Sequence, residues 1–198
     1  DRAELNNLVE AIRTAKTPLI IAGGGILYSE AERVLADLAA RTGIPVAETQ
    51  AGKGALVWDH PQALGSIGVT GTSAANAAAE AADLIVGVGT RLQDFTTGSR
   101  TLFAGKRLMQ INMAALDAIK QGAEAVVGDA RETLEALAEA LADRQVDDRW
   151  RAANRAAVAE WNAAWDVATA PVNALPSDAQ VIGAVWRQAG DDATVVCA

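Results

Sequence analysis

The sequence has very few of the residues that build disulfides and metal sites. Its 198 residues include one cysteine, Cys197, and one histidine, His60. A single cysteine cannot form an internal disulfide, which fits a reducing compartment and predicts a cytoplasmic protein. One cysteine and one histidine also cannot build a zinc site from these residue types. The apolar residues around Cys197 predict that it is buried in a strand.

Long apolar segments and an excess of positive charge are also missing. No segment reaches the roughly 18–20 apolar residues that span a bilayer, and no secretory signal sequence is visible. The 17 lysines and arginines are outnumbered by 25 aspartates and glutamates, which gives a net charge of -8. Nucleic acids and anionic membranes bind basic surfaces. We therefore expect a small-molecule substrate, with no nucleic acid and no membrane as partners.

Small apolar residues are what the sequence has in abundance. Hydrophobic residues make up 51% of the chain, whereas aromatic residues make up only 4%. Such a composition predicts helices packed closely on a sheet, without a few large aromatic anchors. The length suits one α/β domain with additional segments.

Strand-like apolar runs alternate with helix-like periodic segments along the first 142 residues. The apolar runs predict strands at residues 19–22, 44–48, 84–88, 107–112 and 124–127. Helical spacing of apolar residues predicts helices at residues 2–15, 29–42, 72–82 and 130–142. This alternation is typical of an α/β fold with a doubly wound, mainly parallel sheet and helices on both faces. We expect a Rossmann-like sheet of six strands.

Local signals set the expected ends of these elements. Ser29 and Glu32 have the spacing of a capping box, so Ser29 is predicted to cap the second helix. Gly43 is a C-terminal stop signal, and either Thr72 or Ser73 can cap the third helix. Residues 23–25 are predicted to be an exit loop, and residues 50–71 a glycine-rich loop with few regular elements.

Glycine-rich segments follow several of the predicted strands. In open α/β sheets, ligands bind beyond the carboxyl ends of the strands. Glycines let the backbone approach a ligand, and a helix N-terminus offers N–H groups to a phosphate; a tight turn without a ligand explains the glycines equally well. The predicted cofactor-binding residues are Gly24, Gly25, Gly71, Thr72, Gly89, Arg91, Asn112 and Asp129.

Other charged residues have more than one interpretation. Arg91 and Asp94 could bind phosphate or ribose, or could pair with each other. Lys53, between two glycines, could meet an anion, although such a lysine is more often solvated. His60 could act as a general base, but no nucleophile stands in a recognisable motif with it. We predict no catalytic and no metal-binding residue in this chain.

The order and spacing of the glycine motifs resemble a known group of enzymes. Residues 51–54, 58–61, 65–72 and 82–91 are similar to the middle domain of thiamine-diphosphate-dependent enzymes of the acetohydroxyacid synthase group. Residues 48–54, 68–72 and 94–99 are most like a hydrolase branch that opens a cyclic 1,2-dione in myo-inositol breakdown. An acetolactate synthase-type enzyme is the alternative.

This resemblance implies a three-domain enzyme whose flanking N- and C-terminal domains bind thiamine diphosphate and magnesium. The group's activating glutamate lies in the first domain and its Gly-Asp-Gly metal motif in the third, and neither is present here. The implied full-length protein is a homodimer or tetramer. The synthase binds FAD in its middle domain and some relatives bind ADP. The synthase has an aspartate in place of Asn112, which argues against FAD here.

The resemblance also implies a division of the chain. Residues 1–145 correspond to the central domain, residues 146–176 to a helix and linker, and residues 177–198 to the start of the next domain. Trp150, Trp161 and Trp165 share one face of a long predicted helix, together with Ala157, and this face is predicted to pack against another domain or subunit. Because the chain starts at Asp1 and ends in an apolar strand-like run, we interpret it as part of a longer polypeptide.

Overall fold

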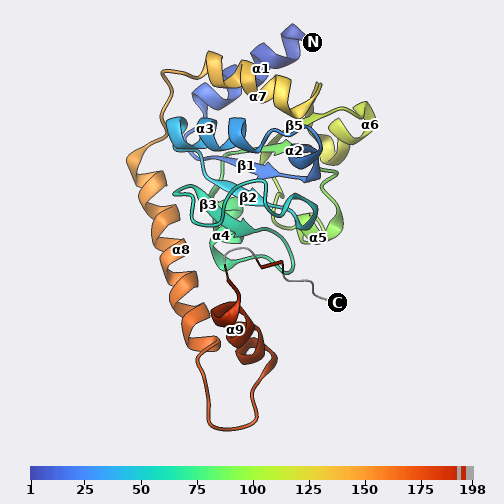
Figure 1. The fold of residues 1–198 in the computed structure, drawn as a ribbon. Helices are drawn as coiled ribbons and strands as arrows, with labels where there is room; N and C mark the ends of the chain where they lie inside the picture. Colours follow the sequence, from blue (N-terminus) through green and yellow to red (C-terminus); the bar gives the residue numbers. More distant parts are fainter. Residues whose placement is uncertain (191–192, 195–198) are drawn as a thin grey trace. The chain divides into compact units, whose positions relative to one another are not determined.

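The computed structural model describes residues 1–190 and 193–194, and it divides into two compact units (Figure 1). The first unit comprises Asp1–Val158 and the second Ala159–Ala198. Cys197 and most of the predicted last strand lie outside the described residues.

The first unit is built on a six-stranded parallel sheet in the order β3-β2-β1-β4-β5-β6. This is the strand order of the dinucleotide-binding doubly wound fold, so the predicted fold class is confirmed. The strands are β1 (Pro18–Ala22), β2 (Val46–Glu48), β3 (Ala63–Ser66), β4 (Leu84–Val88), β5 (Arg107–Asn112) and β6 (Glu124–Val127).

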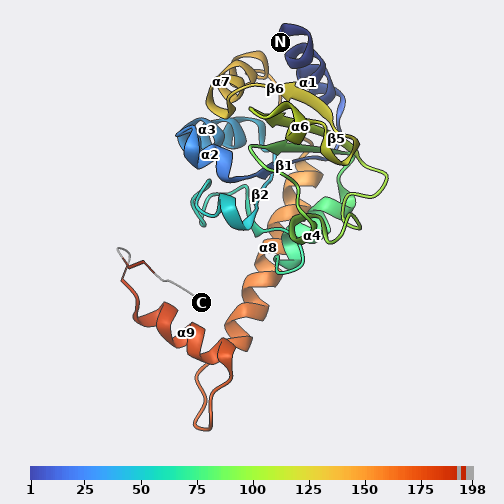
Figure 2. The same ribbon diagram turned by 90° about the vertical axis from the view of Figure 1, so that its right-hand side faces the viewer.

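Helices cover both faces of this sheet. Helices α3 and α7 pack against each other on one face, and α4 lies on the opposite side of the strands (Figure 2). The helices of this unit before α8 are α1 (Arg2–Thr14), α2 (Gly24–Tyr28), α3 (Glu32–Thr42), η1 (Gln50–Gly52), α4 (Ser73–Ala81), α5 (Asp94–Thr97), α6 (Ala115–Ala118), η2 (Lys120–Gly122) and α7 (Ala130–Ala140).

The core of the sheet follows from its central strands. Every residue of β1 and of β4 is buried, as expected for parallel strands with helices on both sides. Alanines on the inner face of α4, including Ala75, Ala78 and Ala79, let this helix approach the sheet closely. The small-residue core that the composition predicts is therefore present.

Two local predictions are wrong. Residues 24–28, expected to start in a loop, form helix α2 directly after β1. Ser29 is the C-cap of α2 and does not cap α3; the N-cap of α3 is Ala31, which has no side chain to accept a hydrogen bond. Residues 50–71, predicted to be a loop with few regular elements, contain two short ones, η1 and the edge strand β3. Strand β3 is not among the predicted strands.

Other helix ends are confirmed. Gly43 ends α3 in the left-handed conformation, with φ of 71°. Thr72, not Ser73, caps α4 through its side chain. Both ends are set by residues next to them in the chain, which explains why the sequence predicts them.

Helix α8 (Asp148–Ala168) begins in the first unit, where Trp150 anchors it. The indole of Trp150 is only 7% exposed, and its Nε1 donates a hydrogen bond of 3.0 Å to the carbonyl of Pro18. Val146 and Trp150 therefore belong to the core of the first unit. The division at residue 145 stays a prediction.

The second unit contains the end of α8 and helix α9 (Asp178–Gln188). Ser177 and Gln180 form a capping box at the start of α9. The guanidinium of Arg187 donates a hydrogen bond of 2.8 Å to the carbonyl of Thr169. This bond ties α9 to the turn that follows α8.

Candidate functional site

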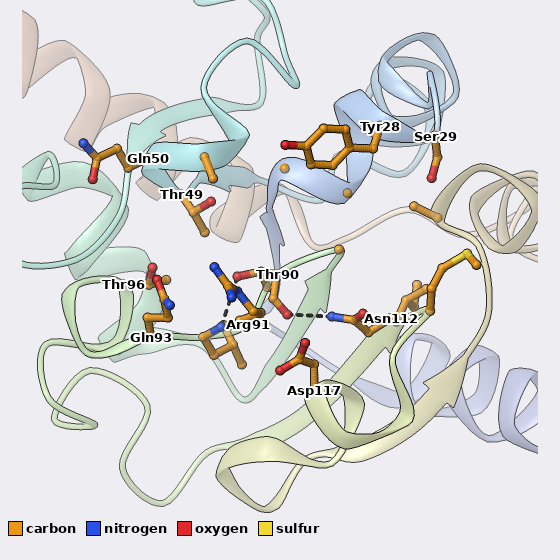
Figure 3. A pocket seen from close by; sticks show the side chains of 18 of the residues that line it. Tyr28, Ser29, Thr49, Gln50, Thr90, Arg91, Gln93, Thr96, Asn112 and Asp117 are labelled. Carbon is orange, nitrogen blue, oxygen red and sulfur yellow. Dashed lines mark hydrogen bonds between the residues drawn. The ribbon is translucent and has the colours of Figure 1, made fainter. Parts of the chain in front are cut away.

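A cavity of about 710 Å³ lies at the carboxyl edge of the sheet (Figure 3). Its walls come from α2, from the loops that follow β2 and β4, from the end of β5 and from the start of α7. Its volume is within the range of small-molecule sites, roughly 300–1,000 Å³. The cavity therefore lies where the doubly wound topology places ligand sites.

Six of the eight predicted binding residues line this cavity. The lining residues are Gly24, Gly25, Gly89, Arg91, Asn112 and Asp129. Gly71 and Thr72 do not line it. The Thr72 hydroxyl donates to the carbonyl of Leu64 at 2.7 Å and accepts from the amide of Ala75 at 3.0 Å. Thr72 thus joins β3 to the start of α4.

The glycines at the ends of β1 and β4 contact each other. The amide of Gly25 donates a hydrogen bond of 2.9 Å to the carbonyl of Gly89. A Cβ on Gly25 would lie 2.5 Å from the Cα of Gly89, and a Cβ on Gly23 would lie 2.4 Å from the carbonyl oxygen of Gly89. This close backbone approach explains these glycines without a ligand. It also occupies the N–H group of Gly25, which is one of the predicted cofactor-binding residues.

Arg91 is the cation of the cavity. No other arginine and no lysine is among the described residues that line it. No ion pair joins Arg91 to Asp94, and no hydrogen bond occupies its guanidinium within the described part of the chain. Of the two predicted alternatives, the pairing with Asp94 is therefore absent, and the guanidinium is available to an anion.

Asn112 is bound on both sides of its amide to the backbone. Its Nδ2 donates to the carbonyl of Thr90 at 2.9 Å, and its Oδ1 accepts from the amide of Ala114 at 3.0 Å. An aspartate has no N–H donor for the Thr90 carbonyl. The hydrogen bond to Thr90 thus explains why an asparagine, and not an aspartate, stands at position 112 in this chain.

Asp129 provides a negative charge at another part of the wall. Its Oδ2 accepts a hydrogen bond of 2.7 Å from the Ser29 hydroxyl, and its Oδ1 accepts from the amides of Arg131 and Glu132 at the start of α7. The bond from Ser29, followed by the bonds from these amides, lowers the pKa of Asp129 below its ordinary value despite some desolvation. Asp129 is therefore a carboxylate at neutral pH.

Several residues of the cavity wall are not predicted from the sequence. They are Tyr28, Thr49, Gln50, Gln93, Phe95, Thr96, Met113 and Asp117. Tyr28, Phe95 and Met113 are 93%, 68% and 69% exposed, so the wall offers apolar surface to a ligand. Thr49 and Gln50 directly follow β2, a position that could have identified them. Tyr28 is missed because α2 is missed.

Two other candidates have partners outside the cavity wall. Lys53 pairs with the buried Glu48 at 3.6 Å, and Glu48 also accepts hydrogen bonds from the amides of Gly54 and Leu56. The His60 Nδ1 accepts from the amide of Gln62 at 3.2 Å. Both residues thus take part in ordering the loop between β2 and β3.

Metal-binding clusters and membrane-spanning helices are both absent from the described part of the chain. No group of three or more histidine, cysteine, aspartate or glutamate side chains is arranged to hold a metal ion. The described helices include none that is long and apolar enough to cross a membrane.

Comparison with known proteins identifies the family. Residues 5–137 match the sequence profile described as thiamine pyrophosphate enzyme, central domain. This range includes every residue that lines the cavity.

Individual relatives share one name. The chain is 50% identical over 139 residues to a 3D-(3,5/4)-trihydroxycyclohexane-1,2-dione hydrolase of Geobacillus thermodenitrificans (strain NG80-2), covering 70% of this chain and 22% of the relative. For the hydrolase of that name from Shouchella clausii (strain KSM-K16), the identity is 47% over 136 residues, covering 68% and 21%. For that from Bacillus thuringiensis (strain Al Hakam), it is 42% over 167 residues, covering 83% and 25%.

The matched part of this chain thus spans only about a fifth to a quarter of the length of these relatives. The fold, the position of the cavity and the profile match agree with one another. The chain belongs to the family of thiamine pyrophosphate enzyme central domains.

Proposed function

We propose that this chain is the non-catalytic central domain of a thiamine-diphosphate-dependent hydrolase. The proposed substrate is 3D-(3,5/4)-trihydroxycyclohexane-1,2-dione, and the proposed product is a 5-deoxyglucuronate formed in myo-inositol breakdown. The observation that carries this proposal is the 50% identity over 139 residues to a hydrolase named for this substrate. Acetolactate synthase is the alternative activity, from the resemblance of the glycine motifs.

In this proposal, the catalytic cofactor site lies outside this chain. Within the described residues, no group of three or more histidine, cysteine, aspartate or glutamate side chains is arranged to hold a metal ion. In this proposal, thiamine diphosphate and magnesium are bound by flanking N- and C-terminal domains of the same polypeptide. Bound thiamine diphosphate supplies an electron sink for cleavage of a carbon–carbon bond. The full-length enzyme is proposed to be a cytoplasmic homodimer or tetramer.

Activity of the full-length protein that carries this domain tests the proposal. We expect it to hydrolyse the cyclic dione only with thiamine diphosphate and magnesium present. Formation of acetolactate from pyruvate, without hydrolysis of the dione, would support the alternative instead. Sedimentation of the same protein would measure whether it is a dimer or tetramer, and cell fractionation would test its location.

We further propose that the cavity binds a nucleotide, either ADP or FAD. Three features support this: the free guanidinium of Arg91, the carboxylate of Asp129, and the exposed apolar side chains of Tyr28 and Met113. A phosphate can meet the cation, sugar hydroxyls can donate to the carboxylate, and a planar ring can lie on the apolar surface. These groups fit ADP or the ADP moiety of FAD, and Asn112, which stands where the synthase has an aspartate, favours ADP.

Thermal unfolding of the 198-residue chain tests nucleotide binding. A ligand at a hundredfold excess over its Kd stabilises the folded state by about 2.7 kcal/mol. We expect ADP or FAD to raise the Tm, and Arg91→Met to reduce that increase. NAD tests specificity, and thiamine diphosphate with magnesium is the control. Unchanged Tm with ADP and with FAD would reject the nucleotide site.

A further inference from the structure

The loop that carries Arg91 is held in an unusual backbone conformation. Gly89 and Leu92 both have positive φ, of 60° and 46°, and Leu92 is almost completely buried. Few residues other than glycine adopt this conformation, and it persists only where surrounding contacts enforce it. Contacts from neighbouring elements must therefore hold Thr90–Leu92 in place.

Three side-chain amides hold this loop. Gln110 and Asn112 of β5 donate to the carbonyl of Thr90, at 3.1 and 2.9 Å. Gln121 of η2 donates to the carbonyl of Leu92 at 3.2 Å. We call Gln110, Asn112 and Gln121 the amide clamp. The clamp fixes the carbonyls of Thr90 and Leu92, the two residues that flank Arg91. The backbone at Arg91 therefore has little freedom.

The residue that the clamp holds, Arg91, has a side chain without a hydrogen bond or ion pair in the described part of the chain. The Arg91 guanidinium has no partner among the described residues, and Figure 3 shows it on the same side of the cavity as Gln93. The side chains of Gln93 and Thr96 also have no hydrogen bond in the described structure. A loop fixed before binding loses less entropy when a ligand binds.

We propose that the amide clamp positions Arg91 to bind a phosphate group of the nucleotide. Gln121 is the informative member of the clamp. It is not among the residues that line the cavity, and the group that it holds is the backbone carbonyl of Leu92, the residue after Arg91. Gln110 is fully buried and Asn112 lines the cavity, so changes at either would also alter packing or ligand contact. This inference rests on the proposed nucleotide site.

The test is a double-mutant cycle on the 198-residue chain, read by calorimetric titration with ADP and with adenosine. Gln121→Met keeps the length of the side chain but removes its N–H donor. We expect it to weaken ADP binding by roughly three- to tenfold, the value of one hydrogen bond, and to leave adenosine binding unchanged. Arg91→Met should weaken ADP binding at least as much. Gln145→Met, at an exposed glutamine outside the cavity, is the matched control.

The cycle separates positioning from general stability. If Gln121 acts through Arg91, Gln121→Met has no further effect on ADP binding in the Arg91→Met background. Equal weakening of ADP and adenosine, an additive double variant, or an unchanged affinity of Gln121→Met for ADP would each overturn the inference. If Gln121→Met leaves ADP affinity unchanged but Arg91→Met weakens it, the inference about the clamp fails and the proposed nucleotide site still stands. If the unaltered chain binds no ADP and no FAD, the nucleotide site is rejected, and the inference with it.

Discussion

At the scale of single residues, the carboxyl edge of the sheet depends on contacts between segments far apart in the chain. Gly25 and Gly89 approach so closely that neither has space for a Cβ. Ser29 donates to Asp129, a hundred residues later. The segments that follow β1, β4 and β6 are therefore joined directly, and the cavity lies among backbone groups that are already fixed.

Replacing Gly89 by alanine tests this close approach. Gly89 and Gly105 both have positive φ, of 60° and 71°, but the added Cβ would lie 2.5 Å from Gly25 Cα at the first position and meet nothing within 4 Å at the second. Gly105→Ala should cost about 1–2 kcal/mol for backbone strain. Gly89→Ala should cost about 1–3 kcal/mol more for overpacking. Urea unfolding measures both, and equal losses would contradict the proposed crowding.

The ion pair between Arg107 and Glu124 predicts a pH dependence of stability. Hydrogen bonds from Arg107 and then from Asn7 lower the pKa of Glu124 from 4.5 to about 2. Because the folded-state pKa is the lower one, the stabilisation is present above pH 4.5 and is lost as the pH falls toward 2. The Glu124 side chain is 41% exposed, so solvent screening keeps the effect within about 1 kcal/mol.

The measurement compares Glu124→Gln with the unaltered chain by urea unfolding at several pH values. The variant should be less stable at pH 7, and the difference should shrink between pH 4.5 and 2. Glu139→Gln, at an exposed glutamate of α7, should show no such trend. A difference that stays constant with pH would show that charge is not its cause.

At the scale of elements, the structure gives Thr72 a role in folding. Its hydroxyl caps α4 and also donates to β3, and it lies outside the cavity wall. The sequence places Thr72 beside the glycines because the loop before α4 looks like the loop after β1. Unlike the loop after β1, the loop before α4 follows the edge strand β3, which is not among the strands predicted from the sequence.

Substitution of Thr72 separates capping from ligand binding. Thr72→Ala should destabilise the chain by about 0.5–2 kcal/mol, the usual cost of losing an N-cap. Thr72→Ser keeps the hydroxyl and should lose less. Neither change should alter the affinity for ADP measured by calorimetric titration. If Thr72→Ala weakened ADP binding and left stability unchanged, Thr72 would be a binding residue and not a helix cap.

At the scale of the whole molecule, the core of the first unit includes residues beyond the predicted boundary at 145. Val146 and Trp150 are buried in this core, and the Trp150 indole is hydrogen-bonded to Pro18. The chain from Asp1 to Val158 thus has its own sheet and core.

Two truncated chains test where the stable domain ends. A chain of residues 1–158 should unfold cooperatively with nearly the Tm of the first unit in the 198-residue chain. A chain of residues 1–145 lacks Trp150 and should be less stable by about 3–5 kcal/mol, the cost of deleting a buried tryptophan. Thermal unfolding followed by circular dichroism gives both values. Equal Tm values for the two truncated chains would show that Trp150 is dispensable.

The sequence by itself determined the fold class, most strand positions and the edge of the sheet at which the cavity lies. These features depend on local patterns, because buried parallel strands are continuous apolar runs and their connections carry glycine and capping residues. Thr72 as a cap and Gly43 as a stop are set by neighbours a few residues away.

Only the tertiary structure decided what the residues at that edge contact. In that structure, Ser29 donates a hydrogen bond to Asp129, Thr72 donates one to Leu64, and Gln121 donates one to Leu92 in the loop that carries Arg91. Each pair joins residues from different elements, and the packing of those elements fixes their distance. Local sequence signals therefore located the site, whereas side-chain partners across the sheet edge determined which of its residues are free to meet a ligand.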